Sequence, residues 1–219
     1  MKPLEFHAPT SLDEAIALLA RNGAEAGILG GGTDLIIQYR AGRRPLGHMV
    51  DVKKIPALNV LSYDDQTGLR LGAAVCCDTL TEYAPALRHY PGLVEGAELI
   101  GSTQIQSRAT VGGNVCNGSP AADTICSLIV LGAVCVLAGP QGTREVAARD
   151  FMTGPGQTAL RPGELLVELR VPPRPPRSAD AYLRFIPRNE MDIAVAGAAT
   201  ALTLAADRKT VQSAAIAIG

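Results

Sequence analysis

Two glycine-bearing segments, far apart in the chain, have the composition of loops that bind phosphate. The first is Gly30-Gly31-Gly32-Thr33-Asp34 and the second is Thr110-Val111-Gly112-Gly113-Asn114. Glycine lets a backbone approach a ligand closely, and the N–H groups at the start of a helix attract an anion. A lone glycine triplet is more often a tight turn. If both segments flank one cleft, however, their N–H groups can hold two linked phosphates without a lysine.

Asp123 follows the second glycine segment and has two interpretations. An acidic residue at the predicted start of a helix is favoured by the helix dipole, and the same carboxylate can accept hydrogen bonds from the hydroxyls of a ligand. Better-known phosphate loops are absent from the sequence: it has no Gly-x-x-x-x-Gly-Lys-Ser/Thr, and no Gly-x-Gly-x-x-Gly with an acidic residue at the right offset. Kinases, P-loop NTPases and Rossmann dehydrogenases therefore lose support.

The sequence nominates no acid, base, nucleophile or metal ligand. His7, His48 and His89 are expected to be structural or solvated, and Ser119 has no His or Asp at a spacing that would activate it. The five cysteines are odd in number, form no Cys-x-x-Cys pair and have no His at ligand spacing. A zinc site and a complete disulfide framework are both disfavoured.

Composition excludes several classes of protein. With 47% hydrophobic and 19% charged residues, the chain is in the range of folded globular proteins. A formal net charge of -1 provides no global field for nucleic acid or for an anionic membrane. Residues 125–138, the longest apolar stretch, fall short of the about 20 residues of a membrane span. The first residues lack the apolar core of a secretory signal, so we expect a cytoplasmic protein.

The elements that position the first glycine segment are readable from local signals. Ser11 and Glu14 form a capping box that predicts a helix, and Asn22-Gly23 predicts its end. A short buried strand is expected at 26–29, a helix at 35–40 and another strand at 48–52. The first 55 residues or so therefore read as a β-α-β-α-β unit with parallel strands.

The remaining chain mixes strands and helices without strict alternation, which favours an α+β fold. A hairpin is expected from strands at 60–63 and 69–74. Helices are expected at 79–88, 94–100 and 121–131, and strands at 134–137, 144–146 and 165–171, with the second glycine segment as a loop. The proline-rich residues 172–177 are the best candidate for a linker. Beyond them, β-rich segments at 182–186, 194–204 and 211–218 either pair with something or begin an incomplete domain.

These motifs, with the Ala122-Asp123 step and the later Arg188-Asn189-Glu190-Met191-Asp192-Ile193-Ala194, resemble in order and spacing the FAD-binding medium subunit of molybdenum hydroxylases. That family includes the flavoprotein components of bacterial xanthine dehydrogenases and carbon monoxide dehydrogenases. The resemblance covers nearly the whole chain. It implies an α+β, two-subdomain FAD-binding module of the vanillyl-alcohol-oxidase type. The implied units are residues 1–58, residues 59–174, and the start of a truncated C-terminal domain at 175–219.

The resemblance also implies the residues that bind FAD. Arg184 stands where the family usually has lysine, and Arg188-Asn189 and Met191 depart from the family pattern beside the flavin ring. No cysteine-rich insert is present that would carry an extra iron–sulfur cluster. The implied contacts are Ile28, Leu29, Gly30, Gly31, Gly32, Thr33, Asp34, Leu35, Ile100, Thr110, Val111, Gly112, Gly113, Asn114, Asp123, Leu166, Arg184 and Ile193.

The function implied is electron transfer in an oxidoreductase complex. Similar subunits take electrons from a two-iron two-sulfur cluster on an iron–sulfur small subunit and pass them through FAD to NAD or another acceptor, while a molybdopterin-binding large subunit oxidises the substrate. Two alternatives stay open. One is a flavin-free, nucleotide-binding or scaffold subunit, and the other is a stand-alone flavin reductase like the cell-wall sugar-nucleotide reductase.

Overall fold

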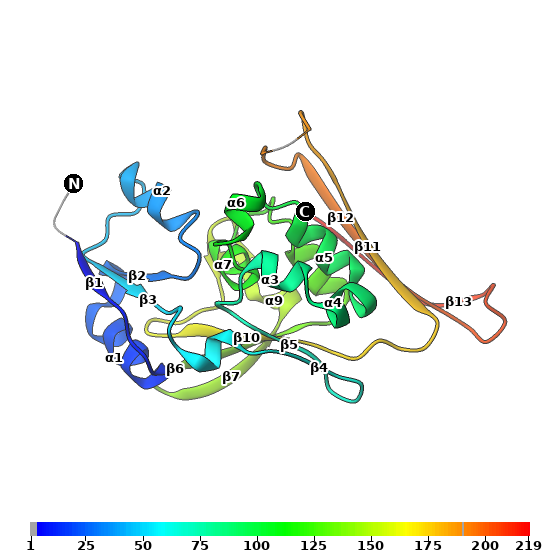
Figure 1. Cartoon of the computed structure of the whole chain (residues 1–219), viewed down its shortest axis with the longest axis horizontal. Helices are drawn as coiled ribbons and strands as arrows, with labels where there is room; N and C mark the ends of the chain where they lie inside the picture. The colour runs from blue at the N-terminus through cyan, green and yellow to red at the C-terminus, as the bar shows by residue number, and fades with distance from the viewer. Residues whose placement is uncertain (1–3, 190) are drawn as a thin grey trace.

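The computed structural model describes residues 4–189 and 191–219. Three main sheets follow one another along the chain, and a short two-stranded ribbon, β8 (Met152–Gly154) and β9 (Gln157–Thr158), lies between the second and the third. Figure 1 shows the N-terminal unit at one end, the last three strands at the other, and most of the helices between them. The mixed composition of helices and sheets confirms the predicted α+β class.

The N-terminal sheet is parallel and has the strand order β1 (Glu5–His7), β3 (His48–Asp51), β2 (Ala26–Leu29). Helices α1 (Leu12–Asn22) and α2 (Leu35–Arg40) connect the strands, as predicted, and a 3₁₀ turn covers Gly23–Glu25. The Ser11 hydroxyl accepts from the Glu14 N–H at 3.2 Å. The Glu14 carboxylate accepts from the Thr10 N–H at 3.1 Å rather than from Ser11.

The second sheet is antiparallel throughout, with the order β4, β5, β10, β6, β7. Its strands are β4 (Leu61–Asp64), β5 (Gly68–Gly72), β6 (Val134–Gly139), β7 (Gly142–Ala147) and β10 (Leu165–Val171). A 3₁₀ turn at Pro56–Asn59 leads into it. The associated helices are α3 (Cys77–Thr81), α4 (Ala84–His89), α5 (Pro91–Glu98), α6 (Thr103–Gln106), α7 (Val111–Asn117), α8 (Ile125–Val130) and α9 (Ala148–Phe151).

Three predictions in this region were wrong in detail. The helix expected at 121–131 is α8 (Ile125–Val130), which begins only after Asp123. The helix expected at 79–88 is divided into α3 and α4, because Pro85 has no N–H to continue a helix and instead occupies the first turn of α4. The second glycine segment, expected to be a loop, forms the first turns of α7. Helices and sheet enclose the main hydrophobic cluster, in which Tyr90, Leu128, Phe151 and Leu169 are fully buried.

The third sheet is antiparallel and consists of β11 (Ser178–Phe185), β12 (Ala196–Leu204) and β13 (Val211–Ile218). One face packs against α5 and α8, where Tyr182 and Ala199 join the main hydrophobic cluster. The opposite face leaves Leu183 and Phe185 exposed, together with Ile216.

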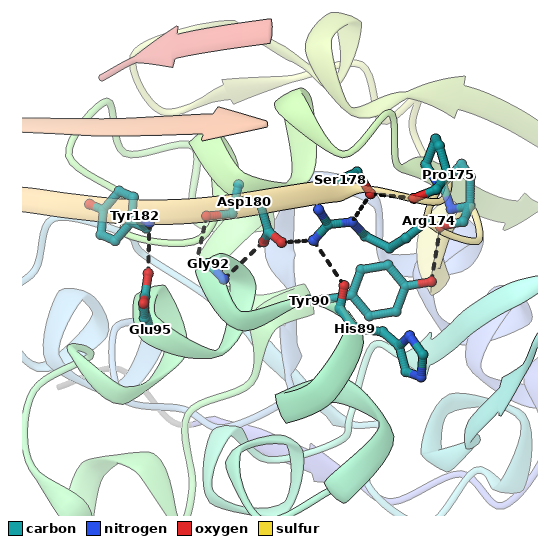
Figure 2. A network of polar contacts seen from close by, with 11 residues as sticks. His89, Tyr90, Gly92, Glu95, Arg174, Pro175, Ser178, Asp180 and Tyr182 are labelled. Carbon is teal, nitrogen blue, oxygen red and sulfur yellow. Dashed lines mark hydrogen bonds and ion pairs between the residues drawn. The ribbon is translucent and has the colours of Figure 1, made fainter. Parts of the chain in front are cut away.

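The proline-rich segment before β11 is anchored rather than loose. Figure 2 shows the Arg174 guanidinium against the Asp180 carboxylate, which also accepts from the Gly92 N–H of α5 at 2.8 Å. The Tyr90 hydroxyl donates to the Pro172 carbonyl at 2.9 Å. The connection between β10 and β11 is therefore fastened to the helices that the third sheet covers.

Among the described residues, none of the helices combines the length and the apolar character that crossing a membrane requires.

Candidate functional site

The first glycine segment connects the end of β2 to the start of α2 and packs against the chain just before α7. A Cβ on Gly31 would overlap the Arg108 carbonyl oxygen and would lie 2.8 Å from the Ala109 Cα. Gly32 has φ +80°, in the left-handed region that favours glycine. The segment therefore needs glycine at one position for contact and at the next for backbone conformation.

The second glycine segment needs its glycines for a different reason. Thr110 is the N-cap of α7, and its Oγ1 accepts from the Gly113 N–H at 2.8 Å. A Cβ on Gly112 would lie 2.6 Å from the Ala73 carbonyl oxygen. The segment was expected to be a loop, but both glycines are helical, and Gly112 is required where α7 packs against Ala73.

The two glycine segments, 80 residues apart in sequence, lie side by side. A Cβ on Gly30 would be 3.4 Å from the Thr110 Oγ1. Their helices are joined as well, because the Gln38 Nε2 of α2 donates to the Asn117 Oδ1 of α7 at 2.9 Å. The sequence analysis made phosphate binding by both segments conditional on their lying together. In the structure they do lie together.

Several backbone donors at this junction are free. Within the described part of the chain, the N–H groups of Gly31, Gly32, Thr33 and Gly112 donate no hydrogen bond to protein. Gly31, Gly32 and Thr33 are partly exposed. A group of adjacent, unpaired N–H donors suits a ligand rich in acceptor oxygens, such as a diphosphate.

Lys53 is a charged residue at the same junction that the sequence did not single out. Its Nζ donates to the Gly30 carbonyl at 3.3 Å and pairs with the Asp51 carboxylate at 2.7 Å. Asp51 is the last residue of β3 and Lys53 follows it, and the carboxyl ends of parallel strands meet at one edge of a sheet. That rule, applied to the predicted strand at 48–52, would have indicated Lys53.

Hydrogen bonds link residues 123 and 124 to the second glycine segment and to β11. The Thr124 hydroxyl donates to the Asn114 Oδ1 at 2.7 Å. The Asp123 carboxylate accepts from the Tyr182 hydroxyl at 3.1 Å and pairs with the Arg184 guanidinium at 3.2 Å. The predicted contacts Asp123 and Arg184 thus touch each other directly.

The electrostatics of this pair are set by burial. Burial raises the pKa of the Asp123 carboxyl above its ordinary value, while the Arg184 charge and the Tyr182 hydroxyl oppose that rise. The Arg184 Nε is buried and, among the described residues, has no hydrogen-bond partner. A buried N–H without an acceptor is costly, so an acceptor from a ligand would relieve that cost.

The hydrophobic residues around the first glycine segment are structural. Leu29 and Leu35 are buried together in a small hydrophobic cluster with Leu46 and Met49, and Ile28 packs against the cluster beneath α1. Their side chains pack β2 and α2 into the N-terminal unit.

The three remaining predicted FAD contacts are apolar residues, and no hydrogen bond links their side chains to the two glycine segments. Leu166 lies on β10 with 4% of its surface exposed, within the main hydrophobic cluster. Ile100 follows α5 and packs against that cluster. Ile193, between β11 and β12, is 75% exposed.

Comparison with known proteins identifies what this arrangement resembles. The model of a protein family described as the FAD binding domain in molybdopterin dehydrogenase matches residues 2–174. The xanthine dehydrogenase FAD-binding subunit of Escherichia coli O157:H7 is 35% identical over 195 residues, which are 89% of this chain and 66% of that subunit. The chain therefore spans slightly less than two thirds of that relative.

Solved structures agree with the sequence comparison. Carbon monoxide dehydrogenase from Hydrogenophaga pseudoflava contains a chain with a TM-score of 0.93 and 33% identity, with 99% of this chain and 74% of that chain covered. Quinoline 2-oxidoreductase from Pseudomonas putida 86 contains one with a TM-score of 0.90 and 27% identity, with 100% and 75% covered.

Proposed function

The chain belongs to the FAD-binding subunits of molybdenum hydroxylases, and we propose that it holds FAD across the junction of its two glycine segments, at residues 28–35 and 110–114. FAD is its cofactor, and the family is one of oxidoreductase subunits. The observation that carries the proposed position is the contact of Gly31 with the Arg108–Ala109 backbone, beside a group of N–H donors that no protein acceptor uses.

In this proposal each residue of the junction has its own role in binding FAD. The free N–H groups of Gly31, Gly32 and Thr33 donate to the diphosphate of the ligand, and Lys53, whose charge Asp51 balances, holds the Gly30 carbonyl at the same edge of the sheet. Asp123 orients the Arg184 guanidinium, whose unpaired Nε donates to an acceptor of the ligand. Bound FAD supplies the redox chemistry, and the protein supplies position and electrostatics.

We further propose that this subunit works in electron transfer. In this proposal an iron–sulfur small subunit delivers electrons, NAD or another acceptor receives them, and a molybdopterin-binding large subunit oxidises the substrate. The names of the relatives support the proposal, because they describe an FAD-binding subunit of a dehydrogenase. No side chain of this chain is required as acid, base or nucleophile.

Two alanine substitutions test the position of the cofactor. Gly31→Ala places a methyl group against the Arg108 carbonyl, whereas the same methyl group at Gly30 meets only the Thr110 Oγ1 at an ordinary contact distance of 3.4 Å. We expect Gly31→Ala to lose most of its FAD and Gly30→Ala to retain it, as measured by flavin absorbance per protein and by fluorescence titration with FAD. Circular dichroism establishes that both variants are folded.

The result that refutes the position is a folded Gly31→Ala variant with stoichiometric FAD and unchanged affinity. A colourless wild-type chain that ignores added FAD would favour the flavin-free scaffold instead. The electron-transfer proposal is tested separately, by co-purification with the iron–sulfur and molybdopterin subunits and by bleaching of the flavin bands on addition of NADH.

Two other features that the family resemblance implies stay predictions. The division of the chain into units 1–58, 59–174 and 175–219 is one of them. The flavin contacts of Ile100, Leu166 and Ile193 are another, and each can be checked by alanine substitution in the FAD titration.

A further inference from the structure

Outside the flavin junction, one side-chain cluster in the described part of the chain has the composition of a metal site. It consists of Glu5, His7 and His48. The His7 Nε2 lies 3.2 Å from the His48 Nδ1, and the Glu5 Oε2 lies 3.4 Å from the His48 Nδ1 and 3.8 Å from the His7 Nε2. Three potential ligand atoms thus form a small triangle.

Strand pairing creates this triangle. Strands β1 and β3 are parallel neighbours, with Glu5 opposite His48 and His7 opposite Val50. Side chains alternate between the two faces of a strand, so Glu5 and His7 share one face of β1, and His48 shares that face on β3. Val50, on the same face, is buried under α1, which places the cluster beside the packed side of the sheet.

The size of the triangle fits a transition-metal ion. The nearest point equidistant from the three atoms lies in their plane, about 2.0 Å from each, which is close to the distances of about 2.0–2.2 Å at which zinc binds imidazole nitrogen and carboxylate oxygen. Two imidazoles and one carboxylate form a donor set that zinc accepts with a fourth position left to water. Magnesium and calcium prefer oxygen ligands throughout, so this set disfavours them.

The alternative is a hydrogen bond between the two histidines, with Glu5 as an ion-pair partner when a ring is protonated. The distance of 3.2 Å between the ring nitrogens permits that bond. It leaves the Glu5 carboxylate in a loose ion pair, with its oxygen 3.4 Å from one ring nitrogen and 3.8 Å from the other, whereas a metal ion would use all three atoms at once. The histidine side chains are shielded, at 21% and 20% exposure, while Glu5 remains accessible at 72%.

We propose that Glu5, His7 and His48 bind a zinc ion that ties the edge strand β1 to the central strand β3. His48 begins β3, whereas the flavin junction follows the opposite end of the neighbouring strand β2. The zinc site is therefore separate from the proposed cofactor site, and neither depends on the other. Its role is structural, since it links the first strand of the chain to the sheet.

The experiment uses the full chain without a histidine tag, dialysed against a chelator and titrated with zinc chloride by calorimetry. The compared variants are Glu5→Gln, His48→Ala and the control His89→Ala, whose ring stacks on Tyr63 in another part of the fold. Wild type and His89→Ala are expected to bind one zinc ion and to unfold at a higher temperature when zinc is present. Glu5→Gln and His48→Ala should lose at least about tenfold in affinity, since losing even an outer partner of a ligand costs 10–100-fold.

Two results of the zinc titration overturn the proposal. One is the absence of saturable zinc binding by wild type. The other is equal binding by wild type, Glu5→Gln and His48→Ala, which would place the ion at cysteine thiols or elsewhere. If His48→Ala fails to fold, Glu5→Gln decides the question, because its exposed side chain can change without disturbing the fold. Magnesium chloride at the same concentration is expected not to displace the zinc, and displacement would also count against the site.

Discussion

Removing the Asp180 carboxylate tests whether the third sheet is held by a buried charge pair. The Asp180 side chain is 1% exposed and the Arg174 side chain 12% exposed, so Asp180→Ala leaves a buried guanidinium without its counter-ion. Breaking one half of a buried pair destabilises a protein by about 3–5 kcal/mol. The Gly92 N–H, which donates to Asp180 at 2.8 Å, loses its acceptor in the same step.

The expected loss is large enough for ordinary thermal melts. For a chain of this size each kcal/mol lowers the unfolding temperature by about 2–4 °C, so Asp180→Ala should unfold roughly 6–20 °C below wild type. The measurement is circular dichroism with temperature, supported by urea unfolding, with both proteins in the same FAD-loaded state. Equal loading matters because bound ligand stabilises the folded form.

Two further variants separate charge pairing from a general effect of substitution. Asp150→Ala removes a carboxylate that is 65% exposed and lies 3.5 Å from Arg149, and a surface pair of this kind contributes only about 0–1 kcal/mol. The double variant Arg174→Met/Asp180→Leu removes both charges and should recover part of the loss. The reasoning is refuted if Asp180→Ala unfolds at the same temperature as Asp150→Ala. It is also refuted if the double variant is less stable than Asp180→Ala alone.

Three other predictions concern a backbone contact, an ion pair and two buried thiols. Gly112→Ala should lower the free energy of unfolding even without FAD, because the new Cβ meets backbone; an FAD effect without a stability change in denaturant melts would contradict this. The Arg144 guanidinium holds the pKa of Glu164 below its ordinary 4.5. The folded state therefore binds fewer protons there, and the stability difference between wild type and Glu164→Gln should be full above pH 4.5 and shrink as the pH falls below it; a difference that grew in acid melts would be the wrong sign. Burial raises the pKa of Cys77 and Cys135 to about 12, so a thiol reagent at pH 8 should label them only after unfolding, and rapid labelling of the native chain in mass spectra would refute their burial.

Local signals in the sequence predicted much of the fold. The N-cap Ser11 and the glycine after Asn22 bound α1, and the segment from β2 through the first glycines to α2 has the predicted limits. Strands β10 and β13 match their predicted residues. These signals are reliable because capping, periodicity and proline act within a few residues of where they occur.

The interpretation of the second glycine segment shows the limit of such signals. The segment Thr110-Val111-Gly112-Gly113-Asn114 looked like a loop. In the structure Thr110 is the N-cap of a helix that begins at Val111, and Gly112 packs closely against Ala73. A loop and a tightly packed helix can share one local sequence, because the neighbour that excludes a Cβ comes from a distant part of the chain.

The sequence by itself determined the α+β class, the β-α-β-α-β unit at the N-terminus and the two segments that suit a diphosphate, since each depends on residues close together in the chain. Only the tertiary structure placed Lys53 at Gly30, the Arg174 guanidinium on Asp180, and Glu5 and His7 beside His48. The physical reason is strand register and packing: a pairing of β1 with β3 shifted by one residue would turn His48 away from Glu5, and no local pattern specifies that register.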